Sequence, residues 1–170
     1  LNIMEIRNDD PTLKLPMPRV GYGEPRPITD ADLRKVLSSN IKLRTYAMII
    51  LGAFQGFRAH EIAQVRTEDI DFNAWTIKVE GKGRKRAVLP LSPEVAQLAK
   101  RMPTEGYWFP AGDRESTKPD EPDHVFANSV SRIVSEAMRR AGVNATCPQL
   151  RHWFATTLLR NGTDLRTLQE

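Results

Sequence analysis

Residues 75–89, which read WTIKVEGKGRKRAVL, decide the fold class of this chain. In the first half of this stretch every second residue is apolar, and a period of two predicts a β-strand with one face turned toward a core. The apolar positions are Trp75, Ile77 and Val79. The Gly-Lys-Gly-Arg sequence of residues 81–84 predicts a hairpin turn, and Ala87 begins the return strand. The sequence therefore places one small antiparallel sheet inside a chain whose other patterns are helical.

Helical patterns lie on both sides of this hairpin. A strongly apolar pattern over residues 41–55 predicts a helix central to the core, and Gly56 ends it. Thr29 and Ser92 are capping residues at predicted helix starts, whereas Gly142 and Gly162 end later helices. The expected helices cover residues 30–38, 41–55, 58–65, 93–101, 125–142 and 150–162, with a polar loop over 110–123 and a last helix from Asp164. The fold class is therefore α+β and mainly helical.

The start of the chain differs in composition from the rest. Five prolines and two glycines lie within the first 27 residues, and this density predicts an extended linker. The chain begins with Leu rather than Met, so we expect a fragment of a longer protein. The remaining residues, 28–170, suit one domain with one hydrophobic core.

Several classes of protein are excluded by composition and spacing. No apolar run approaches the roughly 20 residues that a membrane-spanning helix needs. Cys147 is the only cysteine, so it forms no disulfide within the chain, and we expect it to be small and buried. The three histidines show no zinc spacing, and no nucleotide-binding glycine loop is present. We therefore expect neither a metal nor another cofactor.

Positive charge is concentrated rather than spread along the chain. The net charge is +4, and four of the basic residues fall within positions 82–86 of the predicted hairpin. These residues are Lys82, Arg84, Lys85 and Arg86. Concentrated positive charge favours a polyanion such as DNA, although charge alone is equally consistent with a solvated face.

Three separate segments, each ordinary alone, together form a pattern that is specific for one protein family. They are residues 56–71, beginning Gly-Phe-Arg-Ala-His-Glu; residues 81–91, in which Gly-Lys-Gly-Arg-Lys-Arg leads into Val-Leu-Pro-Leu; and residues 149–164, beginning Gln-Leu-Arg-His-Trp-Phe. In this order they resemble the tyrosine recombinase (phage integrase) family over about residues 27–170. The resemblance implies the integrase catalytic-domain fold, with its small sheet on one side, truncated here at the C-terminus. Residues 1–27 are then the linker from an upstream DNA-binding domain.

The same segments supply groups suited to phosphoryl transfer. Such a reaction spreads negative charge over the non-bridging oxygens, and positioned cations stabilise it. The forked donors of a guanidinium match two phosphate oxygens. The resemblance implies that Arg58 and Arg151 clamp the phosphate and that Lys82 protonates the leaving 5′ oxygen. It also implies support from Glu61, on the same helix face as Arg58, and from His152.

Two features depart from the family pattern. The family usually has histidine three residues before its second arginine, where this chain has Pro148. The nucleophilic tyrosine is also missing, because the chain stops 19 residues after Arg151 and Tyr22, Tyr46 and Tyr107 lie in the wrong places. We therefore expect the 170 residues alone not to cleave DNA, and leave open whether the tyrosine acts in cis or in trans.

The resemblance also implies the partners of the protein. These are double-stranded DNA, further copies of the protein as a tetramer on DNA, and accessory DNA-bending or directionality proteins, with no membrane. We expect Arg84, Lys85 and Arg86 to contact the DNA backbone. The expected setting is the cytoplasm of a bacterium that hosts a phage or mobile element. A non-catalytic DNA-binding relic of the same fold is the main alternative, followed by a type IB topoisomerase and a basic helical transcription factor.

Overall fold

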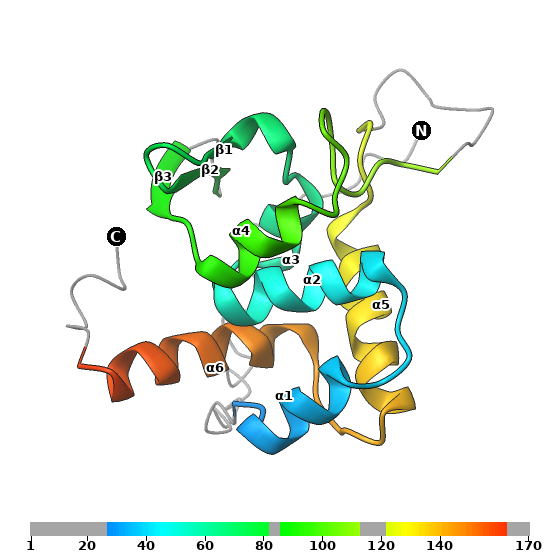
Figure 1. Cartoon of the computed structure of the whole chain (residues 1–170). Helices are drawn as coiled ribbons and strands as arrows, with labels where there is room; N and C mark the ends of the chain where they lie inside the picture. Colours follow the sequence, from blue (N-terminus) through cyan, green and yellow to red (C-terminus); the bar gives the residue numbers. More distant parts are fainter. Residues whose placement is uncertain (1–26, 82–85, 113–121, 163–170) are drawn as a thin grey trace, which may run out of the picture.

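The computed structural model of the chain describes residues 27–81, 86–112 and 122–162 (Figure 1). Within these residues, six α-helices and one 3-10 helix accompany a three-stranded sheet, which confirms the mainly helical α+β class. In chain order the elements are α1 (Asp30–Leu37), α2 (Leu43–Phe54), α3 (Ala59–Ala63), η2 (Thr67–Asp69), β1 (Ile70–Asp71), β2 (Thr76–Glu80), β3 (Arg86–Pro90), α4 (Pro93–Ala99), α5 (Ala127–Arg140) and α6 (Cys147–Arg160). The predicted linker up to residue 26, part of the polar loop and the helix from Asp164 lie outside the described residues.

The sheet is antiparallel and lies on one side of the helices, as expected (Figure 1). Its strands are ordered β1-β2-β3, with Ile77 opposite both Ile70 and Leu89. Ile77 is fully buried and belongs to the hydrophobic core. The apolar alternation therefore identified the inner face of β2 correctly, while the two-residue strand β1 was not predicted.

The prediction that Trp75 continues this inner face is wrong. Trp75 has φ 53° and its side chain is 54% exposed. The Asp71 carboxylate accepts hydrogen bonds from the backbone N–H groups of Asn73 and Ala74, both at 2.9 Å. This side-chain turn curls the backbone tightly, so Trp75 ends the turn instead of opening the strand.

Helix α2 is the centre of the core. It packs against α3, α4, α5 and α6 (Figure 1). Seven consecutive residues, from Ala47 to Ala53, are buried, which confirms the central helix expected from the apolar run. The helix begins at Leu43 rather than at residue 41, because Lys42 is its extended N-cap residue.

Local signals set several helix ends. The Thr29 hydroxyl accepts from the backbone N–H of Asp32 at 3.1 Å, and Ser92 accepts from that of Val95 at 3.2 Å, so both predicted caps are confirmed. Gly142 adopts a φ of +70°, which ends α5 at a left-handed residue. Helices α3 and α5 both start later than predicted, because the backbone at the residue before each is extended.

Two glycines of the α2 segment allow α6 to approach closely. A Cβ atom at Gly52 would lie 2.9 Å from Leu150 Cδ1, and one at Gly56 would lie 2.4 Å from Phe154 Cδ1. A larger side chain at either position would have to displace the Leu150 or Phe154 side chain of α6. Leu150 is fully buried in this contact. The close packing brings the first half of α6 to the C-terminal end of α2, where the candidate site lies.

Candidate active site

The Glu61 carboxylate is the centre of the candidate site. Its side chain is only 6% exposed. Oε2 accepts the backbone N–H of Arg58 at 2.7 Å, and Oε1 accepts Nη1 of the same residue at 3.0 Å. A buried carboxylate is unfavourable unless it is paired and hydrogen-bonded. Arg58 satisfies it with both backbone and side chain, and this contact also fixes the first turn of α3.

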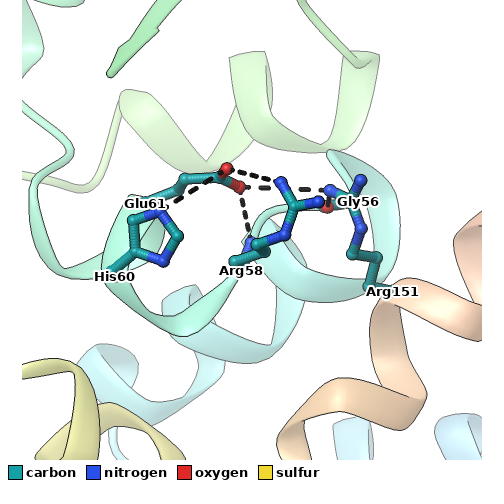
Figure 2. Close-up of polar contacts among 5 residues, drawn as sticks. All are labelled: Gly56, Arg58, His60, Glu61 and Arg151. Carbon is teal, nitrogen blue, oxygen red and sulfur yellow. Dashed lines mark hydrogen bonds and ion pairs between the residues drawn. The ribbon is translucent and has the colours of Figure 1, made fainter. Parts of the chain in front are cut away.

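Arg151 reaches the same carboxylate from α6. Its Nη1 atom donates to the backbone carbonyl of Gly56 at 2.5 Å and lies 4.0 Å from Glu61 Oε2 (Figure 2). The two arginines are 93 positions apart in the sequence, yet both guanidinium groups face one carboxylate. The structure therefore brings together three residues singled out from the sequence: Arg58, Glu61 and Arg151.

The electrostatics of this cluster favour an additional anion. Two guanidinium groups and one carboxylate leave a net charge of +1. Burial and the neighbouring Arg58 cation both lower the pKa of Arg151, with burial the larger cause, while Glu61 opposes them. The side chains of Arg58 and Arg151 are still 56% and 40% exposed. An anion that approaches from solvent can therefore accept from both, and would relieve their mutual repulsion.

The backbone of Gly56 is a part of the site that the sequence did not reveal. Gly56 has φ +69°, a conformation that glycine adopts without a Cβ penalty. The sequence pattern predicts only that Gly56 ends the preceding helix. In the structure its carbonyl is the acceptor that holds Arg151.

Comparison with known proteins agrees with the fold. The sequence pattern of the Phage integrase family matches residues 28–170. The chain belongs to the phage integrase family. It is 44% identical to the integrase from mycobacterium phage Brujita, whose structure gives a TM-score of 0.78 over 96% of this chain and 54% of that one.

Two further matches agree with this assignment, one in sequence and one in fold alone. Tyrosine recombinase XerA of Pyrococcus horikoshii is 29% identical over 167 residues, which cover 95% of this chain and 57% of that protein. The structure of lambda integrase bound to DNA shares the fold at 14% identity, with a TM-score of 0.62 over 80% of this chain and 51% of that one. This integrase-family chain thus spans a little over half the length of the relatives it matches.

The hairpin residues are only partly described. Lys82, Arg84 and Lys85 lie outside the described residues, so the structure does not test their expected roles. Arg86 begins β3 with an 84% exposed side chain, and its Nε atom lies 3.5 Å from Glu80 Oε2. Arg86 is therefore available to a partner at the surface and is only loosely paired.

The first turns of α6 hold the two remaining residues of interest. Pro148 is exposed in the first turn of the helix, where a missing N–H removes no helical hydrogen bond. Thr146 caps this helix, and its backbone N–H donates to Gln149 Oε1 at 2.7 Å. His152 is exposed on α6, directly after Arg151. Proline therefore fits the helix start well, which gives this departure from the family pattern a structural reason.

Gln55 is a further residue near the site that was not predicted from the sequence. It is only 6% exposed. Its Nε2 donates to the Pro90 carbonyl at 2.7 Å, and its Oε1 accepts the backbone N–H of Ser92 at 3.0 Å. Gln55 thus ties the end of α2, three residues before Arg58, to the exit of β3. A lone polar side chain at the end of a strongly apolar run was the signal in the sequence.

Three further findings concern the residues outside this cluster. No group of His, Cys, Asp or Glu in the described part of the chain could hold a metal ion. None of the helices described here is long and apolar enough to cross a membrane. Cys147 is buried as expected, and burial raises the pKa of its thiol to about 11.

Proposed function

We propose that this chain is the catalytic domain of a site-specific DNA recombinase that cleaves and rejoins DNA through a 3′-phosphotyrosyl intermediate. The observation that carries the proposal is the convergence of Arg58 and Arg151 on the buried Glu61 carboxylate, with both guanidinium groups open to solvent. Two positioned cations from separate elements can grip one phosphodiester from two sides. Glu61 supports the arginines and does not itself touch the phosphate.

The proposed reaction conserves the energy of the bond that it breaks. A tyrosine oxygen attacks phosphorus, the bond to the 5′ oxygen breaks, and the leaving oxygen takes a proton from Lys82. The 5′ hydroxyl of another strand then attacks the phosphotyrosyl bond and releases the tyrosine. No residue within the 170 is proposed as this tyrosine. A segment of the full-length gene product outside these residues would supply it, in cis or in trans.

DNA is the proposed partner. The basic residues at positions 82–86 and the family membership support this, and the relative from lambda was solved with DNA bound. A dimer of lambda integrase has also been solved on a core site. We propose that the protein likewise assembles on DNA, as a tetramer, with accessory bending or directionality proteins. His152, exposed beside Arg151, and Arg86 are proposed to lie at this DNA face.

The test uses the full-length gene product and a random-sequence pool of nicked duplexes. Cleavage at a nicked duplex loses the short leaving strand, so the covalent intermediate accumulates. A protein–DNA band that survives SDS is expected, and sequencing the trapped DNA gives the target site. Arg58→Ala and Arg151→Ala should abolish the band, whereas Arg139→Ala, a matched loss of an exposed arginine on α5, should retain it.

A non-catalytic DNA-binding relic is the second candidate, and Pro148 is the observation that favours it. Proline can neither titrate nor hydrogen-bond through its side chain at the position where the family usually has histidine. General acid–base help is worth typically about 10²–10⁴-fold, so its loss slows the reaction without removing the arginine pair. A relic would bind duplex DNA in a salt-sensitive way and form no covalent band with any duplex.

A further inference from the structure

The imidazole of His60 holds an unpaired buried atom. Its Nε2 is shielded from solvent and has no hydrogen-bond partner among the described residues. It lies 3.8 Å from Glu61 Oε1, which is too long for a hydrogen bond. Native proteins leave few buried polar atoms unpaired, so each one calls for a functional or conformational reason.

Glu61 stands between this imidazole and the two arginines. Figure 2 shows His60 on one side of the carboxylate and both guanidinium groups on the other. Oε1, the oxygen that His60 approaches, is also the oxygen that holds Arg58 Nη1 at 3.0 Å. His60 and the side chain of Arg58 therefore approach one acceptor oxygen from opposite sides.

We propose that His60 is a positioning residue that takes over Glu61 Oε1 when Arg58 turns toward a phosphodiester. This inference rests on the proposed function. A turn of the half-exposed Arg58 guanidinium toward a phosphate in solvent would lengthen its side-chain contact with Glu61, in which Nη1 lies 3.0 Å from Oε1. A buried carboxylate oxygen that loses its charged donor is unfavourable. A shift of about 1 Å would bring Nε2–H within hydrogen-bond distance of Oε1 and restore a donor.

The geometry also defines what His60 does not do. Because Glu61 separates it from Arg58 and Arg151, the imidazole does not reach a phosphate held by these arginines. His60 therefore does not replace the histidine that Pro148 displaces. It acts only through Glu61, by keeping the carboxylate satisfied while the Arg58 guanidinium is engaged elsewhere.

The test compares two substitutions of His60 in the full-length gene product. In His60→Gln the amide nitrogen keeps a donor at the reach of Nε2, whereas His60→Phe keeps the ring and removes the donor. The probe is the nicked duplex selected by the wild-type protein. We expect His60→Phe to slow single-turnover adduct formation about 10- to 100-fold, the size of one charge-assisted hydrogen bond. His60→Gln should restore most of the rate, and the Kd for the duplex should stay nearly unchanged in both.

The outcomes separate the two proposals. If the wild type, His60→Phe and His60→Gln all form the adduct at equal rates, the role of His60 is overturned and the proposed function stands. A His60→Gln rate as low as that of His60→Phe has the same consequence. A wild-type protein that forms no adduct refutes the proposed function, and the role of His60 with it. If His60→Phe fails to fold, the imidazole ¹⁵N resonances of the wild-type protein test the role of His60 instead. Binding of the duplex must move Nε2 of His60 to a hydrogen-bonded donor state, and an unchanged resonance overturns the proposal.

Discussion

Replacing Gly56 by alanine tests the contact that brings α6 to the site. The new Cβ would lie 2.4 Å from Cδ1 and 2.7 Å from Cε1 of the Phe154 ring. Both distances are shorter than packed carbon atoms tolerate, so the Phe154 ring must move, and we expect α6 to shift with it. Arg151 is three residues before Phe154 on the same helix face. A shift of α6 would also pull the Arg151 guanidinium away from the Gly56 carbonyl.

The expected loss of stability has two parts. A residue other than glycine in the left-handed conformation, here φ +69°, costs about 1–2 kcal/mol. Overpacking against the Phe154 ring typically costs about 1–3 kcal/mol more. Together we expect Gly56→Ala to lower the free energy of unfolding by about 2–5 kcal/mol, which for a domain of this size corresponds to a Tm lower by about 4–20 °C.

Gly106→Ala is the matched control. Gly106 has a similar φ of +75°, but a Cβ there meets nothing within 4 Å. It should therefore show only the backbone cost of about 1–2 kcal/mol. Urea unfolding followed by tryptophan fluorescence measures both variants. Adding Phe154→Ala should reduce the effect of Gly56→Ala, since it removes the ring that the Cβ meets. Equal losses at Gly56 and Gly106, or no coupling with Phe154, would refute the close packing.

Three other changes test different parts of the structure. Gln55→Leu leaves the Pro90 carbonyl and the Ser92 N–H without their partner, so urea unfolding should show a loss of about 2–4 kcal/mol; an unchanged midpoint would contradict this bridge. Burial raises the pKa of the Cys147 thiol from 9.0 to about 11. Between these pH values the folded protein keeps the thiol proton and the unfolded chain loses it, so the free energy of unfolding should fall from pH 9 to pH 11. Cys147→Ala should flatten this dependence, and a slope that persists would assign it to another group. Pro148→His should speed adduct formation by up to about 10²-fold if the imidazole reaches the phosphate, while a slower reaction would mean that proline is needed to hold the start of α6.

The parts of the fold that follow local rules could be predicted from the sequence. The alternation in β2 places Ile77 in the core because side chains along a strand point to opposite faces. The caps at Thr29 and Ser92 were also readable, since a hydroxyl satisfies free N–H groups within three residues of itself. The prediction for Trp75 was wrong because the nearby Asp71 carboxylate accepts hydrogen bonds from backbone N–H groups and forms a turn. Hydrophobic periodicity does not detect such a turn.

In the candidate site, too, contacts between residues close in the sequence could be predicted, and contacts that depend on tertiary packing could not. Arg58 and Glu61 are three residues apart at one helix start, so their pairing could be expected from the sequence. The approach of Arg151 depends on packing between α2 and α6, and only the family resemblance linked it to Arg58. No local pattern distinguishes Gly56 as an acceptor for an arginine 95 positions away. Gln55 was missed for the same reason, because its partners Pro90 and Ser92 are brought to it by tertiary contacts. His60 was missed because the burial of its Nε2 atom depends on packing and not on a sequence pattern.

The position of Pro148 determines what its side chain can contribute to the proposed reaction. Residue 148 lies one turn before Arg151, and residues three apart share a face of a helix. A side chain at this position therefore faces the same region as the Arg151 guanidinium. Proline adds no titratable group to that region but starts α6 well, and it does not disturb the contact of Arg151 with Gly56. Under the proposed mechanism, electrostatic stabilisation by the two arginines and proton transfer from Lys82 then carry the reaction. Activity should depend more steeply on Arg151 than on any group at position 148.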